Sequence, residues 1–297
     1  MARDPDRIIP LRHYGRWLSG GLVVILVALV VKAFAQGQID WPVVRSFFTA
    51  PALVKGLGHT LLITFLSMAL GLVLGLLFAV MRLSKNPVTR SVATAYVWLF
   101  RGTPVYLQLL IWFNLALIFP NVSLGFFHAR MVDVMTPFLA ALLGLGVNEG
   151  SYMTEIVRGG ILSVEQGQLD AASSLGMSRL LAMRRVVIPQ AMRVIVPSFG
   201  NEFIGMLKTS AMASAIAYTE MLNQAQIIYF INDKIMELLL VAAGWYLIVV
   251  TLFSGVQYYI ERQFARGQSH ELPPSLLERL WSNLFAGHRA AAAEERR

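Results

Sequence analysis

The stretch Asp170-Ala-Ala-Ser-Ser-Leu-Gly-Met-Ser-Arg-Leu-Leu-Ala-Met-Arg-Arg-Val-Val-Ile-Pro189 places charge, small side chains and two helix breakers between apolar segments. Ala171, Ala172 and Leu175 share one helical face, and small Ala side chains let another surface approach closely. Gly176 is a natural end for that helix. Such a short helix is typical of a segment that docks into a partner's groove. An amphipathic loop on the membrane surface has the same pattern.

The composition around this stretch is that of a membrane protein. Apolar residues make up 56% of the 297 residues, and charged residues only 14%, whereas soluble chains carry about 25% charged residues. Apolar runs long enough to cross a bilayer, which takes about 20 helical residues, recur along the whole chain. We therefore predict an all-α integral membrane protein with one membrane domain and no large soluble domain.

Catalytic and metal chemistry find little support in the sequence. Cysteine is absent, which excludes disulfides and thiolate metal sites. The five histidines are scattered and form no ligand pattern. A Gly-x-Ser-x-Gly elbow or a nucleophile paired with a base is not evident either. A membrane-embedded enzyme is therefore disfavoured, and we expect no catalytic residue and no metal site.

Six apolar segments are predicted to span the membrane. The second and the sixth are uncharged and bounded by charge, as spanning helices should be. The third carries Arg101-Gly-Thr-Pro104 near its start, where proline removes a backbone donor and kinks the helix. The predicted spans are about Trp17 to Val31, Gly56 to Met81, Ser91 to Phe119, Pro137 to Arg158, Pro197 to Ile216 and Leu238 to Ile260.

The positions of the charges explain the net charge of +8 by membrane topology and not by nucleic-acid binding, because the arginines flank the apolar segments. With the N-terminus in the cytoplasm, 18 Lys and Arg residues lie inside and four outside. The positive-inside rule therefore predicts that both termini and the 170–189 stretch are cytoplasmic. Cleavage of a signal peptide near Ala33-Phe34-Ala35 is the alternative for the first span, and Lys32 and the long charged leader argue against it.

The 170–189 stretch resembles the EAA motif of ABC importer permeases: Glu-Ala-Ala, three residues, Gly, nine residues, Ile, one residue and Leu-Pro. Every spacing matches, with Asp170 in place of Glu, Val186 in place of Ile and Ile188 in place of Leu. In that family the motif forms a coupling helix that sits in a cleft of the ATPase subunit. The resemblance implies an ATPase-coupling role, within a loop over residues 159–195, for Asp170, Ala171, Ala172, Leu175, Gly176 and Pro189.

Further blocks narrow the resemblance to the polar amino-acid permeases, the histidine, glutamine, glutamate and opine importers. The resemblance covers roughly Gly56 to Arg266. It has one departure: the four residues after Lys208, Thr209-Ser-Ala-Met212, differ from those that usually follow this lysine in the family. The matching blocks are Phe100-Arg-Gly-Thr-Pro104, Gly150-Ser-Tyr-Met-Thr-Glu-Ile-Val-Arg-Gly-Gly160, Gly167-Gln168, Ile188-Pro-Gln-Ala-Met-Arg193 and Asn201-Glu-Phe-Ile204 followed by Lys208.

This resemblance implies a domain organisation. We expect the permease fold, with its cytoplasmic coupling helix, over residues 56–266. A cytoplasmic segment (1–16) and an extra first helix with a periplasmic linker (17–55) precede it. A poorly ordered cytoplasmic tail (267–297) follows it. The implied function is translocation of a polar amino acid across the bacterial inner membrane by alternating access.

The resemblance also implies partners. They are an ABC ATPase dimer, a second permease subunit that is identical or related, and an extracytoplasmic amino-acid-binding protein. None of the five lysines follows Gly, so the chain has no Gly-Lys-Ser/Thr of a phosphate-binding loop. ATP and magnesium are therefore expected in the partner ATPase, and no cofactor is expected in this chain.

Ionisable residues within spans are costly and mark pathways by default. On the fourth span, polar and small residues recur on one helical face from Asn148 to Gly159, and on the fifth from Asn201 to Met212. Facing each other, these stripes are predicted to form a site for a zwitterion. The pathway candidates are Asn148, Glu149, Tyr152, Glu155, Asn201, Glu202 and Lys208.

Simpler roles remain open for some of these residues. Glu155 can pair with Arg158 one turn on, Lys208 can snorkel or pair with Glu202, and Asn201 can form an interhelical hydrogen bond. Arg101-Gly-Thr-Pro104 is interpreted as stabilising a loop region near the inner surface. The small-residue motifs Gly71-x-x-x-Gly75 and Gly146-x-x-x-Gly150 are interpreted as packing surfaces.

An ion-coupled secondary amino-acid transporter is the alternative function. Such a protein carries charges in its spans too, but it needs neither a cytoplasmic docking loop nor an ATPase. Secondary transporters often contain inverted repeats and interrupted helices. The sequence shows no internal repeat, and the spacing of the 170–189 stretch has no explanation under this alternative.

Overall fold

The computed structural model describes residues 14–125 and 127–264. The predicted tail at 267–297 and most of the N-terminal segment at 1–16 lie outside these residues. The long helices are α1 (Tyr14–Gln36), α3 (Pro51–Arg82), α4 (Pro87–Gly102), α7 (Pro137–Leu162), α10 (Ile188–Thr209) and α12 (Ile235–Phe264). The shorter elements are α2 (Trp41–Phe47), α5 (Val105–Phe113), β1 (Asn121–Leu124), β2 (Phe127–Arg130), α6 (Met131–Val134), α8 (Gln166–Ser174), α9 (Arg179–Ala182) and α11 (Met221–Asn232).

All six predicted spans are helical for most of their length, and four of them each fall on one α-helix. By length and composition, three helices of the described chain can cross a membrane: Leu18–Gln36, Pro51–Arg82 and Ile235–Phe264. α7 is 26 residues long but carries three ionisable residues, so it needs protein or water beside it. The third span is not one kinked helix, because it breaks into α4 and α5 around Pro104.

The predicted start of the fifth span at Pro197 is wrong. α10 begins at Ile188, directly after the π-helical stretch Met183–Val187, and holds Pro189 in its first turn. Pro197 lies inside α10, and the buried Gln257 of α12 donates a hydrogen bond to its carbonyl at 2.9 Å. At its other end α10 stops at Thr209 and continues as a 3-10 helix over Ser210–Ile216.

Glycines let α3 and α7 pack closely, which confirms that the two small-residue motifs are packing surfaces. A Cβ at Gly71 of α3 would lie 2.7 Å from Cγ and 2.9 Å from Cβ of Glu149 on α7. A Cβ at Gly146 of α7 would lie 2.7 Å from Cδ2 of Leu70 on α3. Real Cβ atoms do not approach so closely, and any larger side chain would force the helices apart.

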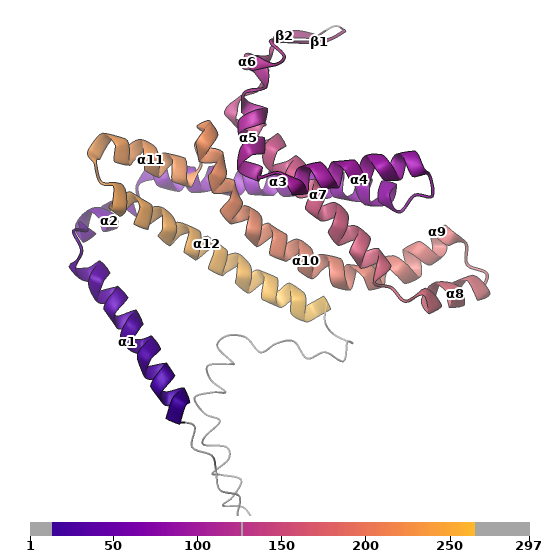
Figure 1. The fold of residues 1–297 in the computed structure, drawn as a ribbon, viewed down its shortest axis with the longest axis horizontal. Coiled ribbons are helices and arrows are strands. Elements are labelled where there is room, and N and C mark those ends of the chain that lie inside the picture. The colour runs from indigo at the N-terminus through magenta and orange to yellow at the C-terminus, as the bar shows by residue number, and fades with distance from the viewer. Residues whose placement is uncertain (1–13, 126, 265–297) are drawn as a thin grey trace, which may run out of the picture.

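Two segments extend from this packed body (Figure 1). α1 runs away from the other helices, and its apolar stretch Leu18–Gln36 has no buried residue. A β-hairpin that the sequence analysis did not predict projects beyond α5 and α6. Its antiparallel strands pair Asn121 with Arg130 and Leu124 with Phe127, and Gly125 provides the positive φ of the turn.

Candidate functional site

The break between α4 and α5 follows from the chemistry of Pro104. Proline has no N–H, so the carbonyl of Phe100, four residues earlier, loses its helical partner. Two side chains replace that partner: Asn148 Nδ2 of α7 donates to the Phe100 carbonyl at 2.6 Å, and Gln108 Nε2 of α5 donates to it at 3.0 Å. The carbonyl that the proline leaves without a helical partner is therefore satisfied, and the break changes the chain direction next to Arg101.

A cavity of about 460 Å³ lies beside this break, between α4, α5, α7 and α10. Its charged groups come from three helices: Arg101 from α4, Glu149 from α7 and Glu202 from α10. Its other polar and small lining residues are Gly102, Thr103, Asn148, Tyr152, Gly205 and Thr209, and its apolar ones are Pro104, Val105 and Met206.

The charges of this cavity are largely unpaired within the chain. The side chain of Glu149 is 4% exposed, and its Oε1 atom has no hydrogen-bond partner among the described residues. The Arg101 guanidinium lies over the Tyr152 ring, 4.7 Å from its centroid, in a cation–π contact. Because a buried polar group without a partner is costly, the carboxylate of Glu149 is suited to a cationic ligand entering the cavity.

Four of the seven pathway candidates line this cavity: Asn148, Glu149, Tyr152 and Glu202. Asn201 and Lys208 are exposed on α10, and the Lys208 side chain has no hydrogen bond or ion pair among the residues described. The predicted alternative of a Lys208–Glu202 pair is therefore not present, and a transport role for Asn201 and Lys208 stays a prediction.

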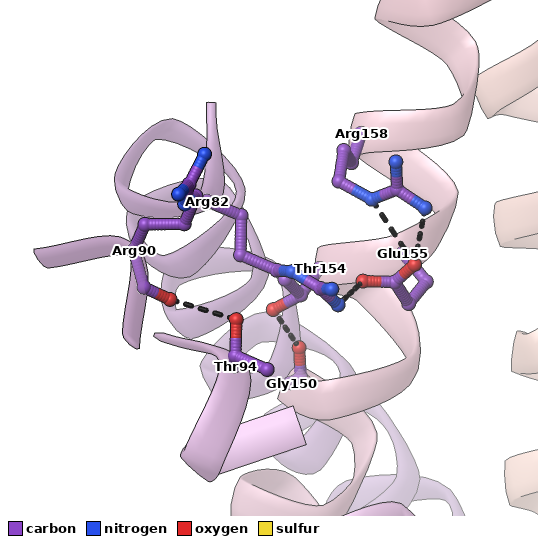
Figure 2. Close-up of polar contacts among 7 residues, drawn as sticks. All are labelled: Arg82, Arg90, Thr94, Gly150, Thr154, Glu155 and Arg158. Carbon is purple, nitrogen blue, oxygen red and sulfur yellow. Dashed lines mark hydrogen bonds and ion pairs between the residues drawn. The ribbon is translucent and has the colours of Figure 1, made fainter. Parts of the chain in front are cut away.

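Glu155 lies outside the cavity lining and forms an ion triad instead (Figure 2). Arg158 Nη2 lies 2.7 Å from Glu155 Oε2, which confirms the predicted pairing one turn along the helix. Arg82, at the end of α3, contacts the other carboxylate oxygen. The three side chains are 20–31% exposed, and they fasten the end of α3 to α7. For Glu155 the simpler structural role is thus the observed one.

The sequence predicted that Arg101 stabilises a loop region near the inner surface, and its depth in the membrane stays a prediction. Arg101 lies about 21 Å along α4 from Pro87 at the usual rise per residue. There it lines the cavity together with two carboxylates. Gln108 was missed altogether, although one signal was available: a proline inside an apolar span leaves a carbonyl that some nearby polar side chain must satisfy.

The second part of the site is the loop between α7 and α10, which Figure 1 shows extending beyond the ends of both helices. α8 ends at Ser174, and the predicted helix stop, Gly176, follows as the left-handed residue of its cap with a φ of +76°. The N–H groups of Gly176 and Met177 donate to the carbonyls of Ser173 and Ala172 at 3.0 and 3.1 Å. This is the hydrogen-bond pattern of a glycine helix cap, in which the left-handed residue is almost always glycine.

The faces of α8 differ in part from the prediction. Ala172 is buried against its own chain, whereas Asp170, Ala171 and Gly176 are exposed and Leu175 is 78% exposed. Leu180 of α9 is 80% exposed as well, so the loop presents apolar side chains outward. A π-helical stretch, Met183–Val187, then leads into α10, where Pro189 lies in the first turn.

The loop is held firmly by the helices that carry it. Gly160, near the end of α7, packs on the start of α10: a Cβ there would lie 3.0 Å from Cδ1 of Ile195 and 3.3 Å from the Ala191 carbonyl. Gln190 Nε2 lies 3.5 Å from Gln168 Oε1 and links α10 to α8. α8 is thus linked to α10 by this contact, and α7 and α10 are packed on each other where the loop leaves them.

Comparisons with known proteins agree with this architecture. Residues 71–266 match the family described as the binding-protein-dependent transport system inner membrane component. The arginine transport system permease protein of Corynebacterium glutamicum is 41% identical over 90% of this chain and 86% of its own length. The L-cystine transport system permease protein of Bacillus subtilis is 38% identical over 77% of this chain and 92% of its own length.

A solved structure agrees as well. One chain of an amino acid ABC transporter, crystallised with histidines, superposes with a TM-score of 0.67 at 35% identity, over 76% of this chain and all of its own length. The chain belongs to the inner membrane components of binding-protein-dependent transport systems, and it is a permease of the amino-acid ABC importer type.

Proposed function

We propose that the cavity between α4, α5, α7 and α10 is the site through which the amino acid passes, and that a separate ATPase drives its opening and closing through α8. One observation carries this proposal: the two helices that hold the coupling loop also line the cavity. α7 bears Glu149 and Tyr152, and α10 bears Glu202 and Gly205. From Tyr152 to the end of α7 is about 15 Å of helix.

This connection supports a mechanical mechanism. A partner that grips the exposed tip of α8 pulls on the ends of α7 and α10, which are packed together at Gly160. α4 and α5 also pack on α7, for example through the hydrogen bond from the Tyr96 hydroxyl of α4 to the Val147 carbonyl of α7, but neither of them is joined to the loop along the chain. Movement of α8 therefore changes the distance between the carboxylates on α7 and α10 and the arginine on α4. Such a change is what alternating access requires.

We further propose a basic amino acid as the substrate. The cavity offers two carboxylates and one guanidinium, and this excess of negative charge matches a zwitterion that carries an additional cation. A relative that is 41% identical is named for arginine transport. Arginine is accordingly the first substrate to test.

The remaining partners follow from the same proposal. Lys208 and Asn201 are exposed on a membrane helix, where contact with lipid would be costly. A second permease subunit with a water-filled path between the two would give them a polar environment. An extracytoplasmic binding protein delivers the amino acid, and ATP and magnesium bind to the ATPase partner. Both termini then lie in the cytoplasm, and the chain lies in the inner membrane.

The test is to isolate the tagged chain from its native membrane and to measure which proteins accompany it. We expect an ATPase in stoichiometric amount, whose ATP turnover rises when an arginine-loaded binding protein is added. Glu149→Gln should weaken arginine uptake in proteoliposomes, whereas Asp133→Asn, which alters an exposed carboxylate outside the cavity, should not. A chain that is recovered alone and shows ion-driven uptake would contradict the proposal and favour the secondary transporter.

A further inference from the structure

Gln108 does more at the α4–α5 break than satisfy one carbonyl. The carbonyl of Phe100 already accepts a hydrogen bond from Asn148 at 2.6 Å, so it does not depend on Gln108. Gln108 Nε2 nevertheless also reaches the carbonyl of Thr103 at 3.0 Å and its hydroxyl at 2.8 Å. Its Oε1 atom accepts from Asn148 Nδ2 at 3.3 Å. The side chain is 5% exposed, so solvent cannot readily replace these bonds.

These bonds fix the backbone on both sides of Arg101. Phe100 precedes Arg101, and Thr103 follows it by two residues in extended conformation, with ψ of 144°. Without a restraint, a broken helix would leave this segment free to turn, because no helical hydrogen bond crosses the break at Pro104. Gln108 supplies the restraint and ties it to α7 through Asn148. The direction in which Arg101 leaves the chain is thereby set.

Arg101 is suited to binding a carboxylate in this position. It lines the cavity and makes no hydrogen bond or ion pair among the described residues, its one specific contact being the Tyr152 ring at 4.7 Å. That contact holds the guanidinium plane and leaves its N–H groups available. A guanidinium binds a carboxylate through two parallel hydrogen bonds, and this geometry depends strictly on orientation.

We propose that Gln108 is a positioning residue, which holds Arg101 so that its guanidinium receives the α-carboxylate of the transported amino acid. This inference rests on the proposed function of the cavity. The side-chain cation of the substrate then lies toward Glu149 and Glu202. Gln108 itself touches no substrate, since the cavity lining does not include it.

The test compares arginine with agmatine, the same molecule without its carboxylate. Their equilibrium binding to the transporter complex is measured in nanodiscs without the binding protein, so that only the permease discriminates between them. In the wild type we expect arginine to bind more tightly. Gln108→Leu should reduce this preference by about tenfold, the value of one misplaced charge-assisted contact. Affinity for agmatine should stay within about twofold, because agmatine makes no contact with Arg101.

Gln257→Leu is the matched control. Gln257 is 6% exposed, and like Gln108 it donates to a backbone carbonyl of a helix that contains proline: its Nε2 atom lies 2.9 Å from the Pro197 carbonyl oxygen of α10. Unlike Asn148 and Arg101, it does not line the cavity. If loss of a buried glutamine acted only through packing, Gln257→Leu and Gln108→Leu would lower the affinities for arginine and agmatine alike. The expected result is a changed preference for Gln108→Leu alone.

Two further variants distinguish the positioning role of Gln108 from the proposed function of the cavity. Arg101→Gln should remove the preference for arginine, and adding Gln108→Leu to it should change nothing more, because Gln108 acts through Arg101. If Arg101→Gln removes the preference and Gln108→Leu does not, the positioning role is overturned and the cavity stands. If arginine binding is unaffected by both Arg101→Gln and Glu149→Gln, the proposed function of the cavity has failed.

Discussion

Gly176 allows the coupling loop to be tested by the addition of one methyl group. Its φ of +76° lies in the left-handed region, where a residue with a side chain costs roughly 1–2 kcal/mol. A Cβ at this position would meet no atom within 4 Å, so Gly176→Ala adds no steric overlap. The whole effect is therefore conformational. It amounts to a five- to thirtyfold shift in the equilibrium between correctly and incorrectly ended α8 helices.

The expected consequence is a loss of coupling rather than of folding. α8 is largely exposed and contributes little to the packed body, so the variant should reach the membrane in normal amount. Without its glycine cap, the hydrogen bonds from Gly176 and Met177 are weakened, and the tip of α8 with the exposed Leu175 is displaced. We expect arginine uptake per ATP hydrolysed to fall by several-fold in proteoliposomes. The shift in the cap equilibrium sets the upper limit of this loss.

Gly167→Ala provides the control within the same helix. Gly167 lies in the first turn of α8, also with open space around it, but without a positive φ. Alanine there should favour the helix slightly and leave uptake per ATP unchanged. Gly176→Asn should lie between the two, since Asn enters the left-handed region more readily than Ala. Equal coupling in the wild type and in Gly176→Ala would refute the role of this cap.

Three further results are expected. Gly71→Ala should lower stability by about 1–3 kcal/mol, because its Cβ would lie 2.9 Å from the Glu149 Cβ, whereas Gly58→Ala on the same helix meets nothing and should be neutral; thermal unfolding in detergent measures both. Glu155→Gln should lower the free energy of unfolding by roughly 1–3 kcal/mol, because it leaves two half-buried arginines unpaired. Asp133→Asn, in the exposed pair with Arg130, should lower it by less than about 0.5 kcal/mol. Deletion of residues 1–36 should leave coupled uptake intact once the protein is inserted, since the stretch Leu18–Gln36 of α1 has no buried residue; a loss of ATP-driven uptake by inserted protein would contradict this.

Much of the fold could be predicted because its signals are local. The uncharged runs within α3 and α12, the small-residue motifs of α3 and α7 and the glycine at the end of α8 each act through neighbours in sequence. The start of α10 was misplaced because two prolines, Pro189 and Pro197, both suit a helix start. Only the bond from Gln257, distant in sequence, shows how the second proline is accommodated inside the helix.

The site was predicted less completely, because its parts meet only in space. Arg101 and Gln108 belong to one span, but the direction of Arg101 depends on Asn148, which lies 48 residues beyond Phe100. The helical stripe on α10 predicted Asn201, Gly205 and Lys208, yet of these three Gly205 alone lines the cavity, beside Glu202. The periodicity of a helix gives its faces, and the neighbouring helices decide which face becomes the site.

The intramembrane charges divide into two groups with different consequences. Glu155 is fully paired with Arg82 and Arg158, and such a triad stabilises one arrangement of α3 and α7. Arg101, Glu149 and Glu202 make no ion pair among the described residues, although unpaired charges at membrane depth are costly to keep. We expect that cost to fall when a ligand carrying both signs of charge enters, so that the closed cavity is favoured only with substrate inside. On this proposal the permease resists closing empty, and ATP-driven movement of α7 and α10 is expected to be completed only when the amino acid is bound.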